Sequence, residues 1–191
     1  MKHLILIVTT VLLFAGCSSV PITGRRQLSL VSNKEVIGLS LQQYDEFMKE
    51  STKSSDRQNT ALVERVGRNI ANAVETYLRN HGYSDMISDF SWEFNLVKSN
   101  EVNAFCMPGG KIVVYEGILP YTRDETGLAV VLGHEVAHAV AKHSNERMSQ
   151  QLVSQLGGVA LGVALANKPE QTQNIAMTVY GLGAQFGIML P

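Results

Sequence analysis

The segment His134-Glu135-Val136-Ala137-His138 combines two imidazoles and a carboxylate at a spacing that suits a divalent metal ion. In a helix, residues i and i+4 lie on one face, so His134 and His138 can direct their rings at the same point. Neutral imidazole nitrogens are common zinc ligands, and the adjacent Glu135 can accept a proton from an attacking water. The pattern predicts a zinc hydrolase in which His134 and His138 bind the metal and Glu135 is the catalytic general base.

The residues around this motif are apolar and predict a buried helix. Apolar side chains flank it on nearly every side of the helix, at Leu128, Val131, Leu132, Val136, Ala139 and Val140. Two histidines and a glutamate are costly to bury without a partner, and a bound cation would supply one. The alternative is that the two histidines lie on the surface of an amphipathic helix and bind nothing.

His143 and Glu146 are nearby candidates for a third metal ligand, and we exclude both. A helix that begins near Thr122 and Glu125, which have capping-box spacing, is expected to continue to Glu146. In such a helix His143 would point about 140° away from the ligand face, at about 100° per residue. Glu146 lies on the same run and cannot easily fold back. A third ligand is therefore expected elsewhere.

Length and composition indicate one domain with a substantial core. The chain has 191 residues, 45% of them hydrophobic, and a formal net charge of −1. Because no basic cluster with interleaved aromatic residues occurs, nucleic acid is excluded as a partner. Of the two cysteines, Cys106 is interpreted as a small buried side chain without chemistry.

Residues 1–16 resemble a bacterial lipoprotein signal peptide. Their apolar stretch of residues 4–14 is too short to span a bilayer, and it leads into Gly16-Cys17. In such a signal Cys17 becomes the acylated first residue of the mature protein, and a following Ser18 resembles the outer-membrane sorting rule. The predicted location is the bacterial envelope, with the protein anchored by lipid at Cys17 to the outer membrane and facing the periplasm. An ordinary secretory signal cleaved near Gly16 is the alternative.

The rest of the chain predicts a mostly helical α+β domain over residues 33–191, joined to the anchor by a tether over residues 17–32. One helix is expected at 33–49, and a second carries an apolar stripe and stops before Gly82. The stripe consists of Leu62, Val66, Ile70, Ala73 and Tyr77. Apolar runs at 156–166 and 175–190 predict a tightly packed helical hairpin against the metal helix, or alternatively a hairpin that dips into a membrane.

A strand is expected from Phe90, followed by a β-hairpin whose turn is Pro108-Gly109-Gly110. The hairpin is either purely structural or an edge beside the metal helix, to which an extended peptide adds as another strand. The second interpretation makes six residues candidates for substrate binding: Asn103, Gly109, Gly110, Ile112, Val113 and Val114.

Three motifs together resemble the HtpX-like and prenyl-protein (CAAX) protease family of zinc metallopeptidases, and within it a bacterial lipoprotein branch. They are His134-Glu135-x-x-His138, Asn103-Ala104-Phe105-x-x-Pro108-Gly109-Gly110, and Thr23-Gly24-Arg25-Arg26-Gln27-Leu28. The resemblance implies a gluzincin fold with a small sheet whose edge strand lies along the substrate cleft. It also implies one zinc ion per chain and the cleavage of misfolded or misassembled periplasmic and outer-membrane polypeptides.

The same resemblance implies a third zinc ligand, a glutamate on a later helix. The segment that carries it would begin after Pro191, so the domain is expected to be truncated here. An alternative function follows, in which an inactive lipoprotein with the peptidase fold binds client proteins or scaffolds an assembly. A secreted helical domain with an accidental motif is a further alternative.

Overall fold

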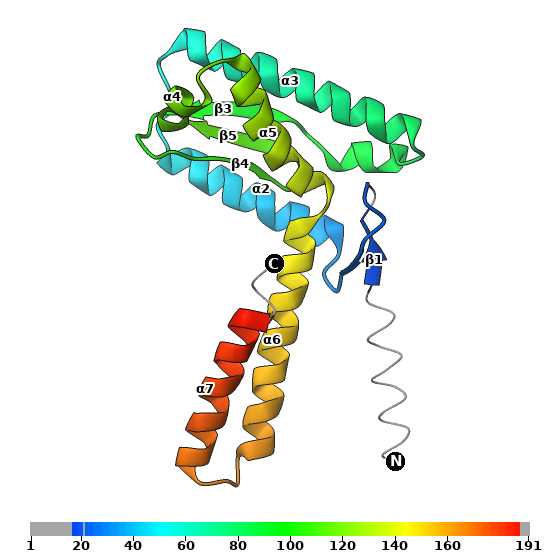
Figure 1. The fold of residues 1–191 in the computed structure, drawn as a ribbon, viewed down its shortest axis with the longest axis vertical. Helices are drawn as coiled ribbons and strands as arrows, with labels where there is room; N and C mark the ends of the chain where they lie inside the picture. Colours follow the sequence, from blue (N-terminus) through cyan, green and yellow to red (C-terminus); the bar gives the residue numbers. More distant parts are fainter. Residues whose placement is uncertain (1–16, 21, 188–191) are drawn as a thin grey trace. The chain divides into compact units, whose positions relative to one another are not determined.

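The computed structural model describes residues 17–20 and 22–187, which form two compact units (Figure 1). Of these residues, the larger unit contains 20, 22–24 and 32–144, and the smaller unit contains 17–19, 25–31 and 145–187. The predicted signal peptide, residues 1–16, lies outside the described residues. The chain is mostly helical with a small sheet, so the predicted α+β class is confirmed.

The sheet of the larger unit has three strands in the order β3-β5-β4. Strand β3 (Glu93–Val97) runs parallel to β5 (Lys111–Tyr115), and β4 (Ala104–Met107) runs antiparallel to it. The predicted hairpin is therefore formed by β4 and β5. Its turn contains Gly109 and Gly110 with φ of 91° and 84°, values that favour glycine because it has no Cβ.

Helices cover both faces of this sheet (Figure 1). Alternate residues of a strand point to opposite faces, so Ile112 and Val114 face one core and Val113 faces the other. The larger core lies under α3 (Arg57–Asn80) and α5 (Glu125–Val140), with Val63, Leu78, Leu128, Leu132 and Val136 almost completely buried. The smaller core lies under α2 (Asn33–Glu50), where Tyr44 packs with Val97 and Val113.

Local capping decides where the helices of the larger unit begin. The predicted capping box of α2 is present, because Ser32 accepts from the Glu35 backbone N–H and Glu35 accepts from the Ser32 N–H. The predicted cap of α5 is wrong. Its N-cap is Asp124, whose carboxylate accepts from the Gly127 N–H at 2.8 Å. Thr122 instead ends the short helix α4 (Leu119–Thr122), which follows the 3-10 turn η2 (Glu116–Ile118).

The buried face of α3 agrees with the predicted stripe in part, because Val66 is buried and Leu62 and Ile70 pack against the core. The buried residues are Val63, Val66, Gly67, Ala71 and Leu78, whereas Ala73 is exposed and Tyr77 is 37% exposed. Apolar residues along this helix form two overlapping stripes, and packing against β3 selects between them. A Cβ at Gly67 would overlap the Phe94 ring. Because glycine has no Cβ, the Phe94 ring of β3 can pack directly against the helix backbone at this position.

The predicted tether contains a two-stranded ribbon in the smaller unit. Strand β1 (Cys17–Ser19) pairs antiparallel with β2 (Arg26–Leu28). The chain next to β2 is bound to α6 (His143–Leu165), because the Arg25 guanidinium contacts both carboxylate oxygens of Glu146 and the Leu30 N–H donates to Ser149 Oγ at 2.9 Å. A free linker would not hold these contacts.

The predicted helical hairpin at the carboxyl end is formed by α6 and α7 (Glu170–Gly187), which run side by side in Figure 1. The Tyr180 hydroxyl donates to the Ser154 carbonyl at 2.7 Å. Contrary to the tight packing expected, Val159, Val163 and Val179 are between 64% and 73% exposed. Within the described residues, no helix is both long and apolar enough to cross a bilayer. Packing of the hairpin against the metal helix concerns two separate units and stays a prediction.

Candidate metal centre

Helix α5 carries the histidine motif on the face opposite its core contacts. Leu128, Leu132, Val136 and Val140, spaced four residues apart, are at most 1% exposed. His134 and His138 lie on the other face and are exposed. The prediction that the motif is buried is wrong, because only one side of α5 packs against the core and apolar Val130 is 69% exposed. Burial therefore does not favour a cation at this site, whereas the geometry of the two imidazoles does.

The two imidazoles converge. Nε2 of His138 lies 3.0 Å from Nε2 of His134, the ring centroids are 4.5 Å apart and the planes are nearly perpendicular. Zinc–nitrogen bonds of about 2.0–2.1 Å in a tetrahedral site place two ligating nitrogens about 3.3 Å apart. A small ring rotation reaches that separation, so the pair fits two ligand positions of zinc.

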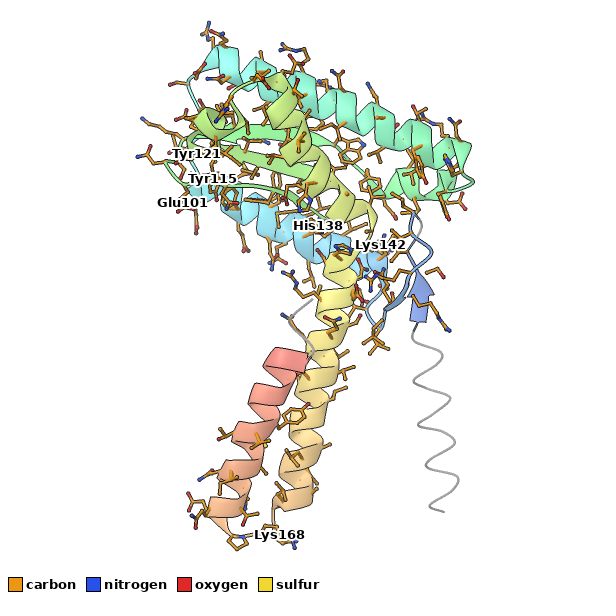
Figure 2. The ribbon with its side chains drawn as sticks, viewed as in Figure 1. Glu101, Tyr115, Tyr121, His138, Lys142 and Lys168 are labelled. Atoms are coloured by element: carbon orange, nitrogen blue, oxygen red, sulfur yellow. The ribbon has the colours of Figure 1, made fainter. Side chains whose placement is uncertain are left out.

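The position of the pair along α5 also favours a cation. His138 lies in the last turn of this helix, which ends at Val140 (Figure 2). The carbonyl groups at a helix C-terminus carry a partial negative charge that stabilises cations nearby. The backbone at the end of α5 therefore favours a bound cation, as the two imidazoles do.

Glu135 is half-buried on α5, the helix that packs against strand β4. Burial raises the pKa of the Cys106 thiol to about 12, and the negative charge of Glu135 adds to this shift. Cys106 stays a neutral thiol at neutral pH, as expected of a residue without chemistry.

The described residues contain no group of three or more histidine, cysteine, aspartate or glutamate side chains placed to hold one metal ion. Glu146 contacts Arg25. The continuous helix used to exclude His143 is not observed, because α5 ends at Val140 and α6 begins at His143. His143 nevertheless lies on the wrong side to join the pair. Its Nδ1 is 2.6 Å from Nδ1 of His138, whereas His134 faces Nε2.

Strand β5 cannot receive a substrate strand, which corrects the prediction for Ile112, Val113 and Val114. All three are 0% exposed, and β5 is paired on both sides, with β3 and β4. Gly109 and Gly110 form the turn, where the absence of a side chain at Gly110 makes room for the Trp92 ring.

The open edge of the sheet belongs to β4. The outer edge of β3 is covered, because the Ser54 N–H donates to the Leu96 carbonyl at 2.9 Å and the Lys98 N–H donates to the Thr52 carbonyl at 2.8 Å. No such backbone partner lies along the outer edge of β4 in the part of the chain that the structure describes.

Strand pairing shows which backbone groups of β4 face outward. Exposed Asn103 precedes the strand, and its carbonyl accepts from the Tyr115 N–H at 3.1 Å. Since hydrogen-bonded pairs alternate along an antiparallel ladder, Ala104 and Cys106 direct their N–H and carbonyl groups away from β5. The sequence shows the hairpin but does not distinguish its edge strand from its central strand.

The chain is similar to known metallopeptidases over most of its length. The model of the family described as Peptidase family M48 matches residues 60–190. The chain is 37% identical to the mitochondrial metalloendopeptidase OMA1 of Schizosaccharomyces pombe over 139 residues, which are 71% of this chain and 38% of that protein.

Two further relatives come from a vertebrate and a bacterium. The human mitochondrial metalloendopeptidase OMA1 is 31% identical over 80% of this chain and 28% of its own length. The beta-barrel assembly-enhancing protease of Escherichia coli K12 is 31% identical over 38% of this chain and 16% of its own length. The chain thus spans less than half of each of these relatives.

Proposed function

The chain belongs to peptidase family M48, and on this basis we propose that it is a zinc-dependent endopeptidase acting on extended polypeptides. The observation that carries the proposal is the convergence of His134 and His138, with their Nε2 atoms 3.0 Å apart, on the helix that packs against the open-edged strand β4. Hydrolysis of a peptide bond needs a metal, a base and a place to hold the chain, and these residues supply the ligands, the base and the edge.

Each residue has a defined role in this proposal. His134 and His138 hold the zinc ion through Nε2. Bound zinc supplies Lewis acidity, which polarises the scissile carbonyl and lowers the pKa of water. The Glu135 carboxylate accepts a proton from the attacking water and transfers it to the nitrogen of the leaving amine. Outward backbone groups of Ala104 and Cys106 hydrogen-bond to an extended substrate and hold it alongside α5.

Zinc binding tests the metal site without depending on catalysis. The wild-type chain is expected to bind one zinc ion, measured by titration against a chromophoric chelator. His134→Ala should lose this binding, because one imidazole of the pair is removed. His81→Ala is the matched control, since His81 is a histidine of the same unit at the end of α3. Equal zinc binding by wild type and His134→Ala would contradict the proposed site and favour an accidental motif.

The cellular setting is also a proposal. We place the protein in the bacterial envelope, anchored by lipid at Cys17 to the outer membrane, where it degrades misfolded or misassembled periplasmic and outer-membrane proteins. The role in the envelope is supported by the relatives from Yersinia pestis and Escherichia coli K12, both named beta-barrel assembly-enhancing protease. The lipid anchor is proposed from the Gly16-Cys17 pattern of the sequence alone. The mitochondrial relatives carry no information on a bacterial anchor.

If Cys17 carries the lipid anchor, replacing it should move the protein from a detergent phase to an aqueous phase. Produced in a bacterium with residues 1–16 included, the wild-type protein should enter the detergent phase of a two-phase extraction, because acyl chains contribute about 0.8 kcal/mol per buried methylene. Cys17→Ser should remain in the aqueous phase. Cys106→Ser is the control for a general effect of losing a thiol. Recovery of the wild type in the aqueous phase would contradict the lipid anchor.

A further inference from the structure

The helix is interrupted between α5 and α6, and the break places a third histidine next to the motif. The Lys142 N–H donates to the Ala139 carbonyl at 3.1 Å, and Lys142 adopts φ of 56°, in the left-handed region. Non-glycine residues rarely adopt this conformation without support from the surrounding structure. Because α5 stops here, the His143 ring lies against the His138 ring, with centroids 4.8 Å apart.

Contacts within the larger unit hold this corner in place. The Lys142 ammonium lies 3.5 Å from Oδ2 of Asp89, the last residue of the 3-10 turn η1 (Ser84–Asp89). The same oxygen accepts from Nδ2 of Asn33, the first residue of α2, at 2.7 Å. Figure 2 shows Lys142 next to His138 at the end of α5. Contacts from η1 and α2 thus hold the corner at Lys142, and His143, the first residue of α6, follows it directly.

The two ring nitrogens of His138 face different partners. Nε2 faces His134 at 3.0 Å, and Nδ1 faces Nδ1 of His143 at 2.6 Å. A histidine that binds a metal through Nε2 carries its proton on Nδ1, and this N–H usually donates to an acceptor that sets the tautomer and the ring orientation.

We propose that His143 is a positioning residue for the metal site, whose Nδ1 accepts the Nδ1–H of His138 and keeps the Nε2 lone pair of His138 directed at the metal. The inference rests on the proposed function, in which His134 and His138 hold zinc. It assigns His143 no direct bond to the metal. In this arrangement the His143 proton is on its Nε2, so its Nδ1 lone pair is available to His138.

The test compares two substitutions at the same position. His143→Ala removes the acceptor, and zinc affinity should fall about 10- to 100-fold, as for other partners of metal-binding histidines. His143→Asn places an amide oxygen close to the position of the imidazole Nδ1, so it should restore most of the affinity. Chelator competition gives the affinities, and thermal unfolding of the metal-free proteins reports any general loss of structure.

Proton and nitrogen NMR of the zinc-loaded proteins gives a readout independent of catalysis. A slowly exchanging proton on Nδ1 of His138 should appear in the wild type and in His143→Asn, and it should be lost in His143→Ala. Asp89→Ala removes the partner of Lys142 and so loosens the corner that positions His143. It should weaken zinc binding in the same direction, although the His143 side chain is still present. His81→Ala again serves as the control with unchanged binding.

The outcomes separate this inference from the function on which it rests. If the wild type binds zinc and His134→Ala does not, but His143→Ala binds as tightly as the wild type, the positioning role is wrong and the metal site stands. Equal weakening by His143→Ala and His143→Asn would also overturn the role, because an acceptor alone would then be insufficient. If His134→Ala has no effect, the proposed function fails first.

Discussion

Glu135→Gln should lower peptide-bond hydrolysis by the zinc-loaded protein about a thousandfold, within the range of general acid–base catalysis. The glutamine side chain has nearly the same shape as glutamate but cannot accept the proton of the attacking water. Because Glu135 is not a metal ligand in the proposed site, zinc affinity should be unchanged. Cleavage of casein by the complete gene product, measured with zinc affinity on the same samples, checks both expectations.

A matched control separates loss of the base from loss of charge. Glu125 is on the same helix, ten residues before Glu135, and it pairs with Arg65. Glu125→Gln should therefore leave cleavage unchanged.

Cleavage that survives in Glu135→Gln would show that another group acts as the base. If the wild type binds zinc yet cleaves nothing, the protease proposal fails. The alternative, an inactive protein that binds clients or scaffolds an assembly, would then be favoured.

Proline substitutions at neighbouring positions of β4 should have different consequences. Proline has no backbone N–H, so its effect depends on where that N–H points. Alternation along the ladder directs the Phe105 N–H towards β5 and the Cys106 N–H outward. Phe105→Pro should destabilise the fold by about 1–3 kcal/mol, because the carbonyl of buried Val113 loses its partner. Chemical denaturation measures this loss.

Cys106→Pro should largely spare the fold and impair substrate binding. The substitution removes an outward N–H from the edge where an extended peptide is proposed to pair. Losing one hydrogen bond of about 1 kcal/mol, together with the bulk of the ring, should lower kcat/KM for an extended peptide about tenfold. The change should appear mainly in KM, with zinc affinity unchanged. Cys106→Ala is the control, since it keeps the N–H. Unchanged cleavage by a folded Cys106→Pro protein would show that substrates do not pair with β4.

The sequence alone determined features that depend on neighbouring residues. The spacing of His134 and His138 brings their rings to one helix face, because a helical turn repeats every 3.6 residues. Ser32 and Glu35 begin α2 through contacts three residues apart, and the two glycines at 109 and 110 allow the hairpin turn. These features need no information from distant parts of the chain.

Only the tertiary structure decided the features that depend on distant residues. Whether β4 or β5 is the edge strand depends on β3, which pairs with β5 from outside the hairpin. The buried face of α3 depends on where Phe94 meets Gly67. The end of α5, and with it the contact between His143 and His138, depends on Asp89, which pairs with Lys142 across 53 residues of sequence. The three features share one physical reason. Local sequence determines which helices, strands and turns a segment can form, and contacts with distant residues determine which of its surfaces is buried and where it ends.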